Sequence, residues 1–542
     1  MSYQRVLVIG LDGATFDLMK PWMESGYLPN LQRLMRQGSS AELESVIPPE
    51  SPLAWTSFAT GKNPGKHGIY GFYEPKANSY SLSPINAGSN RATTIYRMLS
   101  DAGKKPVLIS VPFTFPPEPL ENGLIVPGEF SIPGEDGSAS LVCHPPEIAN
   151  EVRSTVKDPR LMVDASHIFK SKETFLKDLH KTTNTLEQLI DHFMETRDWD
   201  YFMTVFSGVD QVEHYFYRDY VQDEQFSEAM LGYYEQVDKA VARILDKVDD
   251  DTLLLVMSDH GMTHFRKYFC LNLWLDEQKY IAFKQPVRRK IKQTAVRWAR
   301  KTGIQETLMK YVDLSRFGQG AVSNALGFSD VDFDNTLAYA YGFGSIRINL
   351  RGREPNGQVA PEDYERVRDE LINRLKREID PRTGLPILDG VYRREEIYDG
   401  PCVDGAPDIV VRSDRFWPNG LAGVGPFANL YSNKLEYSPV INGMHAMNGI
   451  FIAHGPHVKS QVAVDDPRII DLAPTILYAL GLPIPDDMDG RVLMELFDES
   501  YTAEHQPMYK AVDVTLTQNQ YQWQGNEEAL LLERLKDLGY MA

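Results

Sequence analysis

Short apolar segments, each followed by a turn that carries a polar side chain, recur along the chain. The segments 6–11, 201–206 and 252–257 are dominated by aliphatic residues, methionine and aromatic residues. Apolar runs of this length are typical of strands that are buried on both faces of a parallel sheet. A further run at 106–111 has the same character. We therefore expect a central β-sheet whose strands lie far apart in the sequence.

The stretches between these runs have the spacing of amphipathic helices, with apolar residues every three or four positions. This spacing predicts helices at 16–35, 51–60, 173–196 and 228–247. Further strands near 345–349, 408–411 and 449–453 and helices at 361–378 and 469–480 continue the alternation. Residues 112–148 are rich in Pro and Gly, which favours loops. Alternating strands and helices predict the α/β class.

One segment differs from this α/β pattern in its charge. Residues 275–330 contain a predicted helix in which Lys and Arg crowd beside an apolar stripe that includes Val287 and Ile291. The charged face of this helix either contacts solvent or binds a membrane surface or an anionic partner. We therefore expect a discontinuous core over 1–274 and 331–499 and a basic helical insertion at 275–330. A C-terminal extension over 500–542 ends in a predicted helix at 527–538.

The composition is that of an ordinary globular protein, with 42% hydrophobic and 24% charged residues. The 75 acidic and 56 basic residues give a net charge of −19, which argues against binding a nucleic-acid polymer through its phosphates. Cys143, Cys270 and Cys402 are too widely spaced for a disulfide framework. No apolar segment approaches the roughly 20 residues that span a bilayer. We expect a cytoplasmic protein without a membrane span, and the oligomeric state stays open.

Acidic and imidazole side chains gather directly after the apolar runs. The carboxyl ends of parallel strands share one edge of a sheet, so residues that follow them are expected to meet there. Asp210 and His214 are four residues apart, so one helical turn would place both on one face. Singly, each such residue has a structural explanation such as helix capping. Together they predict a polynuclear metal site, formed by Asp12, Asp210, His214, Asp259, His260 and His445.

A hydroxyl group is expected close to such a site. Ser51 stands where a loop enters the predicted helix at 51–60, and Pro52 follows at a position that helices favour for proline. One interpretation makes Ser51 the N-cap residue of this helix. The other makes its oxygen a metal-bound nucleophile, at a helix N-terminus that attracts an anionic phosphoryl group.

Several short motifs follow one another along the chain. They are Asp12-Gly13, Thr60-Gly61 with His67-Gly68-Ile69, Asp210-x-x-x-His214, Ser258-Asp259-His260-Gly261-Met262, Gly443-x-His445 and the segments at 452–456 and 471–477. Their order resembles the alkaline phosphatase superfamily, and within it the type I phosphodiesterase/nucleotide pyrophosphatase family. The resemblance spans about residues 5–275 and 335–495 and implies a mostly parallel central sheet flanked by helices. It also implies two divalent metal ions, with Zn²⁺ as the first choice and Mn²⁺ as the alternative.

Carried over residue by residue, the resemblance implies two metal-binding triads. Asp210, His214 and His445 would hold one metal. Asp12, Asp259 and His260 would hold the other, which Ser51 would also bind. Counting back from Thr60-Gly61 places the family's nucleophile on Ser51. The implied reaction is an in-line attack on phosphorus through a phosphoryl- or nucleotidyl-enzyme intermediate, with a small phosphorylated or nucleotide-like substrate.

Two positions depart from the family pattern. The nucleotide pyrophosphatases usually carry Thr at the nucleophile and Asn three positions later, where this chain has Ser51 and Ala54. We expect Lys62, Asn63 or Lys66 to supply the missing contact with the phosphoryl group. A serine nucleophile is also typical of phosphomonoesterases and cofactor-independent phosphoglycerate mutases of the superfamily. A phosphomonoesterase or phosphomutase is therefore the alternative function, and a non-catalytic metal- or phosphate-binding protein is a third.

Overall fold

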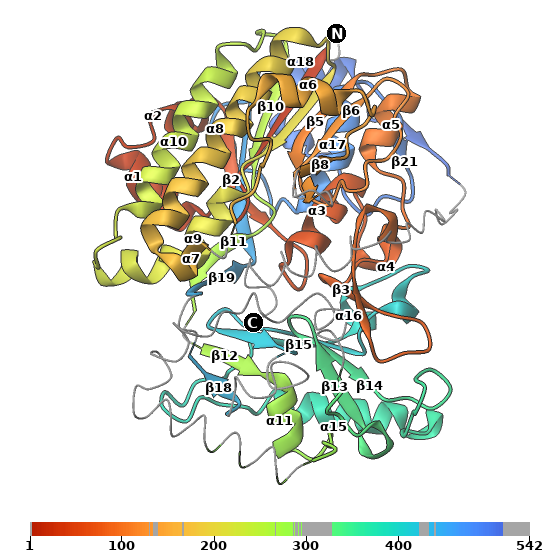
Figure 1. The fold of residues 1–542 in the computed structure, drawn as a ribbon. Coiled ribbons are helices and arrows are strands. Elements are labelled where there is room, and N and C mark those ends of the chain that lie inside the picture. The colour runs from red at the N-terminus through yellow and green to blue at the C-terminus, as the bar shows by residue number, and fades with distance from the viewer. Residues whose placement is uncertain are drawn as a thin grey trace.

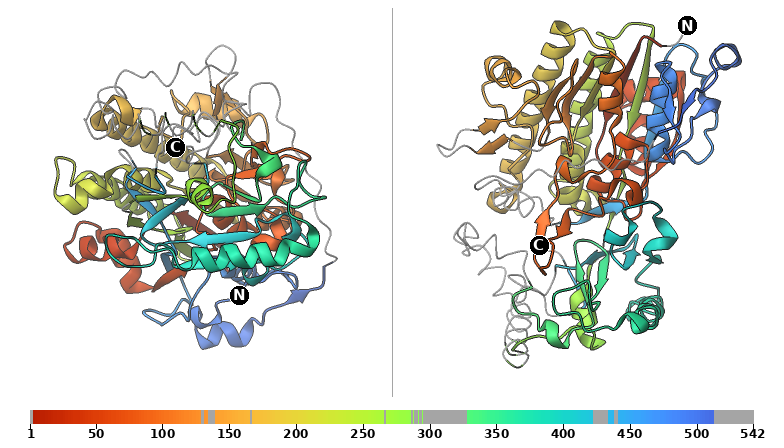
Figure 2. Two further views of the ribbon diagram at one scale, coloured as in Figure 1. Left: turned by 90° about the horizontal axis from the view of Figure 1, so that it is seen from below. Right: turned by 90° about the vertical axis from the view of Figure 1, so that its right-hand side faces the viewer.

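The chain forms a large body around one central sheet and a smaller body around two short sheets, stacked one on the other (Figures 1 and 2). The structure is a computed structural model. It describes residues 3–128, 131–133, 139–164, 167–265, 267–285, 328–421, 433–437 and 441–512, with the single positions 287, 291 and 294. Most of the predicted basic insertion and the predicted helix at 527–538 lie outside these residues.

Among the described residues the central sheet has seven strands, six of which run in one direction while β20 runs in the opposite one. The mostly parallel α/β architecture is therefore confirmed. In spatial order the strands are β2 (Ser39–Glu44), β20 (Asn448–His454), β10 (Thr252–Met257), β1 (Arg5–Gly10), β9 (Tyr201–Val205), β5 (Pro106–Val111) and β6 (Leu124–Pro127).

Helices cover both faces of this sheet, which explains why its strands read as continuous apolar runs. Leu7 and Ile9 of β1 point into one hydrophobic core, and Val6 and Val8 point into the other. The first face is covered by α1 (Phe16–Glu24), α2 (Pro29–Gln37), α6 (Ile148–Thr155), α8 (Lys172–Thr196), α9 (Gly208–Gln222) and α10 (Ala229–Leu245). The second is covered by α3 (Ser51–Thr60), α5 (Ile95–Asp101) and α17 (Leu472–Ala479).

Two sequence predictions need correction in this body. The single helix expected at 16–35 is two helices, because α1 ends before Gly26, whose φ of +83° is left-handed, and Pro29 begins α2. The segment 112–148 is not only loop. It supplies β6 to the edge of the central sheet and the hairpin of β7 (Ser131–Pro133) and β8 (Ala139–Leu141).

The smaller body lies beyond the carboxyl ends of the central strands (Figure 1). The strands predicted near 345–349 and 408–411 exist, but they form a separate antiparallel sheet and do not extend the central one. This sheet contains β13 (Ala338–Tyr341), β14 (Ser345–Ile348), β16 (Ile409–Arg412) and β15 (Gly390–Arg393), with α15 (Tyr364–Leu375) and α16 (Arg394–Ile397) beside it. A second sheet contains β17 (Phe416–Asn419), β12 (Lys267–Cys270) and β18 (Leu435–Glu436), and α11 (Leu271–Glu277) follows β12.

A two-stranded ribbon of β11 (Gly261–His264) and β19 (Gly443–Ala446) leads from the central sheet toward the smaller body. His445 lies inside β19, and not in a loop before the next strand. Within the part of the chain that the structure describes, no helix has the length and apolar character to cross a membrane. The remaining elements are α4 (Pro64–His67), β3 (Tyr73–Pro75), β4 (Leu82–Pro84), α7 (His167–Lys170), β21 (Ile484–Pro485), α18 (Glu499–Glu504) and β22 (Tyr509–Lys510).

Candidate functional site

The site is assembled at the carboxyl ends of three neighbouring parallel strands, β10, β1 and β9. Asp12 follows β1, Asp259 and His260 follow β10, and α9, which carries Asp210 and His214, follows β9. Segments separated by about 250 residues of sequence therefore meet at one sheet edge, as open α/β sheets favour. The six predicted ligands form two groups, each of which brings its ligand atoms within 4.8 Å of one another.

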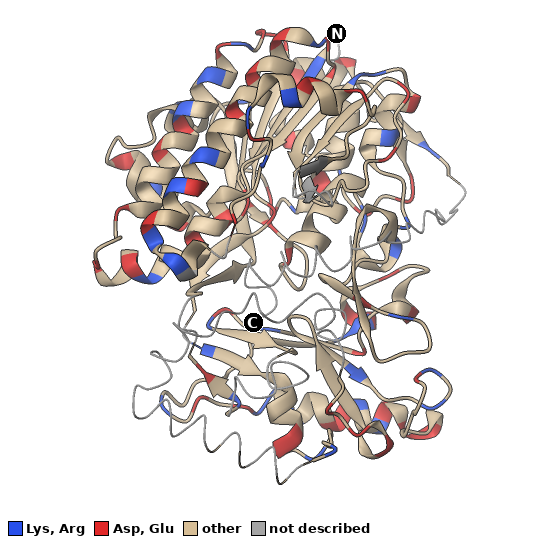
Figure 3. Ribbon diagram, viewed as in Figure 1, with Lys and Arg blue, Asp and Glu red and all other residues tan. Residues whose placement is uncertain are grey.

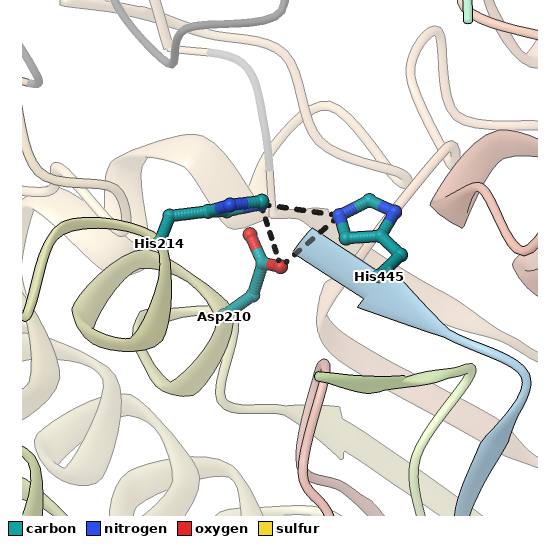
Figure 4. A group of neighbouring side chains, drawn as sticks. All are labelled: Asp210, His214 and His445. Carbon is teal, nitrogen blue, oxygen red and sulfur yellow. Dashed lines mark hydrogen bonds and ion pairs between the residues drawn. The ribbon is translucent and has the colours of Figure 1, made fainter. Parts of the chain in front are cut away.

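The first group consists of Asp210, His214 and His445 (Figure 4). The two imidazole Nε2 atoms are 3.1 Å apart, and they lie 3.1 and 3.4 Å from Asp210 Oδ1. Asp210 and His214 are one turn apart on α9, as their spacing predicted. Three buried nitrogen and oxygen atoms pointing at one another form an arrangement that suits a divalent cation.

The second group consists of Asp12, Asp259 and His260. His260 Nε2 lies 3.4 Å from Asp259 Oδ2 and 3.8 Å from Asp12 Oδ1. Both of these carboxylate oxygens are buried without a hydrogen-bond donor among the described residues. Because buried carboxylates are costly unless they are paired or coordinate a metal, these two oxygens fit a cation.

Backbone carbonyl groups orient all three histidines. The Nδ1 atoms of His214, His260 and His445 lie 2.8, 3.0 and 2.9 Å from the carbonyl oxygens of Gly443, Gly261 and Pro49. Nδ1–H donates in each case, so each Nε2 keeps its lone pair for a metal. The carbonyls of Gly443 and Pro49 were not predicted from the sequence, because a backbone group leaves no residue-type signal.

The electrostatics of the two groups also favour bound cations. Burial, and then the charges of Asp259 and Asp210, raise the pKa of Asp12 well above its usual range. Burial lowers the pKa of His260 to about 4 and also lowers the pKa of His445, whereas Asp210 raises the pKa of His214 against the effect of burial. Neutral imidazoles are the metal-binding form, and clustered carboxylates repel until a cation neutralises them.

Ser51 lies beside the second group. It is the first residue of α3, and its Oγ is 3.2 Å from His260 Nε2. The N-cap position belongs to Glu50, so the prediction that Ser51 is the N-cap is wrong. The Ser51 hydroxyl is turned toward the ligands, at a helix N-terminus that favours anions. One turn further along α3, Trp55 Nε1–H donates to Asp12 Oδ2 at 3.4 Å. Its i+4 spacing from Ser51 could have indicated this contact.

Two glycines permit the close packing around the ligands. Gly13 has a φ of +76°, and a Cβ there would lie 3.3 Å from the Asp210 Cα. A Cβ at Gly443 would lie only 2.5 Å from the carbonyl oxygen of Glu213. Side chains at these positions would push α9 away from β1 and β19. This steric requirement explains the glycines of the Asp-Gly and Gly-x-His motifs.

The structure does not bring Lys62 and Asn63 to this site, so the prediction that they contact the phosphoryl group needs correction. Both follow α3 at the end opposite Ser51, and ten helical residues span about 15 Å. The Lys62 ammonium pairs with the carboxylate of Asp487. Asn63 caps α4 and bonds to Asp489. Lys66 pairs with Asp489 at 2.6 Å, which leaves all three with structural partners.

His67 of the motifs, and Arg353 in the turn after β14, also have structural partners. Ser57 Oγ and His67 Nε2 are 2.9 Å apart in the core. His67 Nδ1 accepts from the backbone N–H of Ile69, so Nε2 carries the proton and cannot act as a base toward Ser57. Arg353 bonds to both carboxylate oxygens of Asp408, so its guanidinium stabilises the turn after β14.

Comparisons with known proteins identify the family and the fold. Residues 6–418 match the family model of type I phosphodiesterase / nucleotide pyrophosphatase. Two solved structures share the fold. Phosphonoacetate hydrolase from Sinorhizobium meliloti 1021 aligns with a TM-score of 0.53 and 16% identity over 88% of this chain and 95% of that one. Human ectonucleotide pyrophosphatase/phosphodiesterase 5 aligns with a TM-score of 0.50 and 14% identity over 92% of this chain and all of that one.

A shorter similarity links the chain to curated transferases. GPI ethanolamine phosphate transferase 3 of Saccharomyces cerevisiae is 31% identical over 107 residues, which is 18% of this chain and 10% of that protein. The match therefore spans about a tenth of the relative's length. The family model, by contrast, covers most of the chain. This protein belongs to the type I phosphodiesterase / nucleotide pyrophosphatase family.

Proposed function

We propose that the protein is a two-metal hydrolase of phosphoric esters that uses Ser51 as its nucleophile. The observation that carries this proposal is the position of Ser51 Oγ, 3.2 Å from His260 Nε2 at the N-terminus of α3. Asp12, Asp259 and His260 would hold one divalent ion together with Ser51, and Asp210, His214 and His445 would hold the other. When bound, such ions neutralise the carboxylates and stabilise negative charge on the entering and leaving oxygens.

The chain's own groups support a covalent route. Ser51 Oγ attacks phosphorus, the bond from phosphorus to the leaving oxygen breaks, and a phosphoryl- or nucleotidyl-Ser51 intermediate forms. Water then attacks the same phosphorus, and the bond to Ser51 Oγ breaks. The N-terminus of α3 would attract the anionic phosphoryl oxygens. The buried position of the hydroxyl keeps bulk water from competing with it.

We propose Zn²⁺ as the metal, because each triad mixes imidazole and carboxylate ligands, and Mn²⁺ as the alternative. The proposed substrates are small phosphorylated or nucleotide-like diesters or pyrophosphates. The cytoplasmic location stays a prediction.

Hydrolysis of a chromogenic phosphodiester and the corresponding monoester, with metal analysis of the same sample, tests the proposal. We expect Ser51→Ala to reduce kcat by at least about a thousandfold, the scale at which removal of a nucleophile acts, while the metal content persists. Ser57→Ala is a matched control, because it removes a hydroxyl from the same helix that faces His67. Full activity in Ser51→Ala, or no turnover of either ester by the metal-loaded protein, would refute the proposal. A preference for the monoester would favour the phosphomonoesterase or phosphomutase alternative.

Transfer to an alcohol is the second candidate function, and the similarity to GPI ethanolamine phosphate transferases supports it. The same Ser51 intermediate would then react with an acceptor hydroxyl. An assay that adds an excess of a simple alcohol separates the two functions. A hydrolase releases mainly free phosphate or nucleotide, and a transferase forms mainly the new ester.

A further inference from the structure

A cavity of about 230 Å³ lies between the two bodies, where α9 and β11 meet the smaller body. Arg218, Gln222 and His264 line it from the larger body, and Lys267 and Arg382 line it from the smaller one. Arg218 is half-buried and lies one helical turn beyond His214 on α9. The cavity therefore adjoins the first metal-binding triad along the helix without sharing a ligand with it.

Aromatic side chains separate this cavity from the metal ligands. Trp417 stacks on His214 with ring centroids 5.4 Å apart and planes at 12°. Phe265 packs edge-on against Trp417, with ring centroids 5.5 Å apart, and Phe265 also lines the cavity. Both rings are buried, so a ligand of the cavity is shielded from the reacting groups at the metal site.

Positive charge dominates the cavity. None of the side chains of Arg218, Lys267 and Arg382 forms an ion pair or a hydrogen bond with a described residue. Lys267 instead lies over the ring of Tyr437, with its Nζ 4.8 Å from the ring centroid. The acidic residue of the lining, Asp380, accepts hydrogen bonds from the Arg382 backbone N–H and the Thr383 hydroxyl, and the charges of Lys267 and Arg382 also act on its carboxylate.

Two of the four cations that line another cavity are paired with carboxylates. A larger cavity of about 560 Å³ is lined by Lys62 and Lys66, and these residues pair with Asp487 and Asp489. Acidic and basic residues are also interleaved along the helices of the larger body (Figure 3). The three cations of this cavity outnumber its one acidic lining residue, although the chain has a net charge of −19. Like charges around one cavity repel, and a bound anion relieves that repulsion.

The backbone of this region is held in place before any ligand binds. Asn442 lines the cavity, and its side-chain oxygen accepts a hydrogen bond from the backbone N–H of Arg218 at 2.8 Å, while its backbone N–H donates to the His214 carbonyl oxygen at 2.8 Å. Its carbonyl oxygen accepts from the N–H of Phe265. The guanidinium of Arg218 thus starts from a fixed backbone, which reduces the entropy lost when it binds.

We propose that this cavity is a second anion-binding site, which takes a free oxyanion of the phosphate type and is separate from the metal centre. Its volume is below the roughly 300–1,000 Å³ of pockets for drug-sized ligands, which favours a small ion. Two guanidinium groups and one ammonium group match the charge and the acceptor oxygens of a phosphate-type ion. The site goes beyond the proposed hydrolysis and stands whether or not Ser51 is the nucleophile.

Calorimetric titration of the metal-loaded full chain with inorganic phosphate tests this site. We expect two classes of binding in the wild type, one at the metal centre and one in the cavity. The double variant Arg218→Gln/Lys267→Gln should weaken the second class at least about tenfold, which corresponds to about 1.4 kcal/mol, and should leave the first class unchanged. Arg33→Gln/Arg36→Gln is the matched control, because it removes the same charge from the exposed face of α2.

Three results would overturn the proposal. One is a single class of phosphate binding in the wild type. Another is a double variant that keeps both classes. The third is a variant that binds phosphate normally but has a raised KM only for substrates with a second phosphate, since the anion would then belong to the substrate. If the double variant does not fold, Arg382→Gln at the exposed rim tests the same prediction with less structural risk.

Discussion

The imidazole rings of His260 and His445 stack with their centroids 3.7 Å apart and their planes at 21°, although each histidine belongs to a different triad. His260 follows a strand of the central sheet, and His445 comes from a ribbon strand almost 200 residues later. The stacked pair places the two groups of ligands side by side. It also makes each group sensitive to a change in the other.

Removal of metal should destabilise the protein. Without cations, burial and the neighbouring Asp259 and Asp210 raise the pKa of Asp12, which shows that the carboxylates repel one another. A metal that binds only the folded state adds about 2.7 kcal/mol to the free energy of unfolding at a hundred times its Kd. We expect a chelator to lower Tm and Zn²⁺ or Mn²⁺ to restore it, as followed by calorimetry. In Asp12→Asn the difference in Tm between loaded and chelated protein should shrink, and an unchanged difference would contradict the assigned ligands.

Gly13→Ala should reduce metal binding more than the addition of a single methyl group suggests. The φ of +76° at Gly13 costs a residue with a Cβ about 1 kcal/mol, and the added atom would also press on the Asp210 backbone 3.3 Å away. Because Asp210 and Asp12 flank this contact, ligands of both triads should be displaced from their positions. Metal content by mass spectrometry should fall, whereas Gly26→Ala, which has a similar φ and open space around it, should leave metal content unchanged.

The sequence was sufficient for five of the seven strands of the central sheet, and for bringing the six candidate ligands to one sheet edge, because both depend on local patterns. Apolar runs mark doubly covered strands, and the ligands follow those runs at fixed offsets. The smaller body was not predicted as a separate unit, because the sequences of the four-residue antiparallel strands at 338–412 do not indicate which sheet each strand joins. Lys62 and Asn63 were misplaced because closeness to Ser51 in sequence is not closeness in space once α3 separates them.

Acid should destabilise the protein partly through His67. Burial, and then the charge of Lys62, lower the pKa of this imidazole from 6.5 to about 3. Between these two pH values the unfolded chain binds a proton that the folded chain does not, so the free energy of unfolding falls as pH falls from 6.5 toward 3. The slope that one such group contributes is about 1.4 kcal/mol per pH unit. In denaturant unfolding, the free energy of unfolding of His67→Gln should fall less steeply between pH 6 and about pH 4 than that of the wild type. Equal slopes of the free energy against pH would be evidence against this role of His67.

Lys62 offers a direct test of the corrected assignment. Its ammonium and the Asp487 carboxylate are mostly buried, with side-chain exposures of 8% and 14%. Lys62→Met would leave that carboxylate without its cation, and breaking one partner of a buried pair typically costs about 3–5 kcal/mol. We therefore expect a large loss in the free energy of unfolding, measured by denaturant titration. The double variant Lys62→Met/Asp487→Asn should recover part of this loss, because no buried charge remains.

Under conditions where both variants are folded, kcat/KM should stay within about twofold of the wild type, since Lys62 lies a helix length from Ser51. A selective fall in kcat without a change in stability would instead return Lys62 to the phosphoryl-binding role that the sequence suggested.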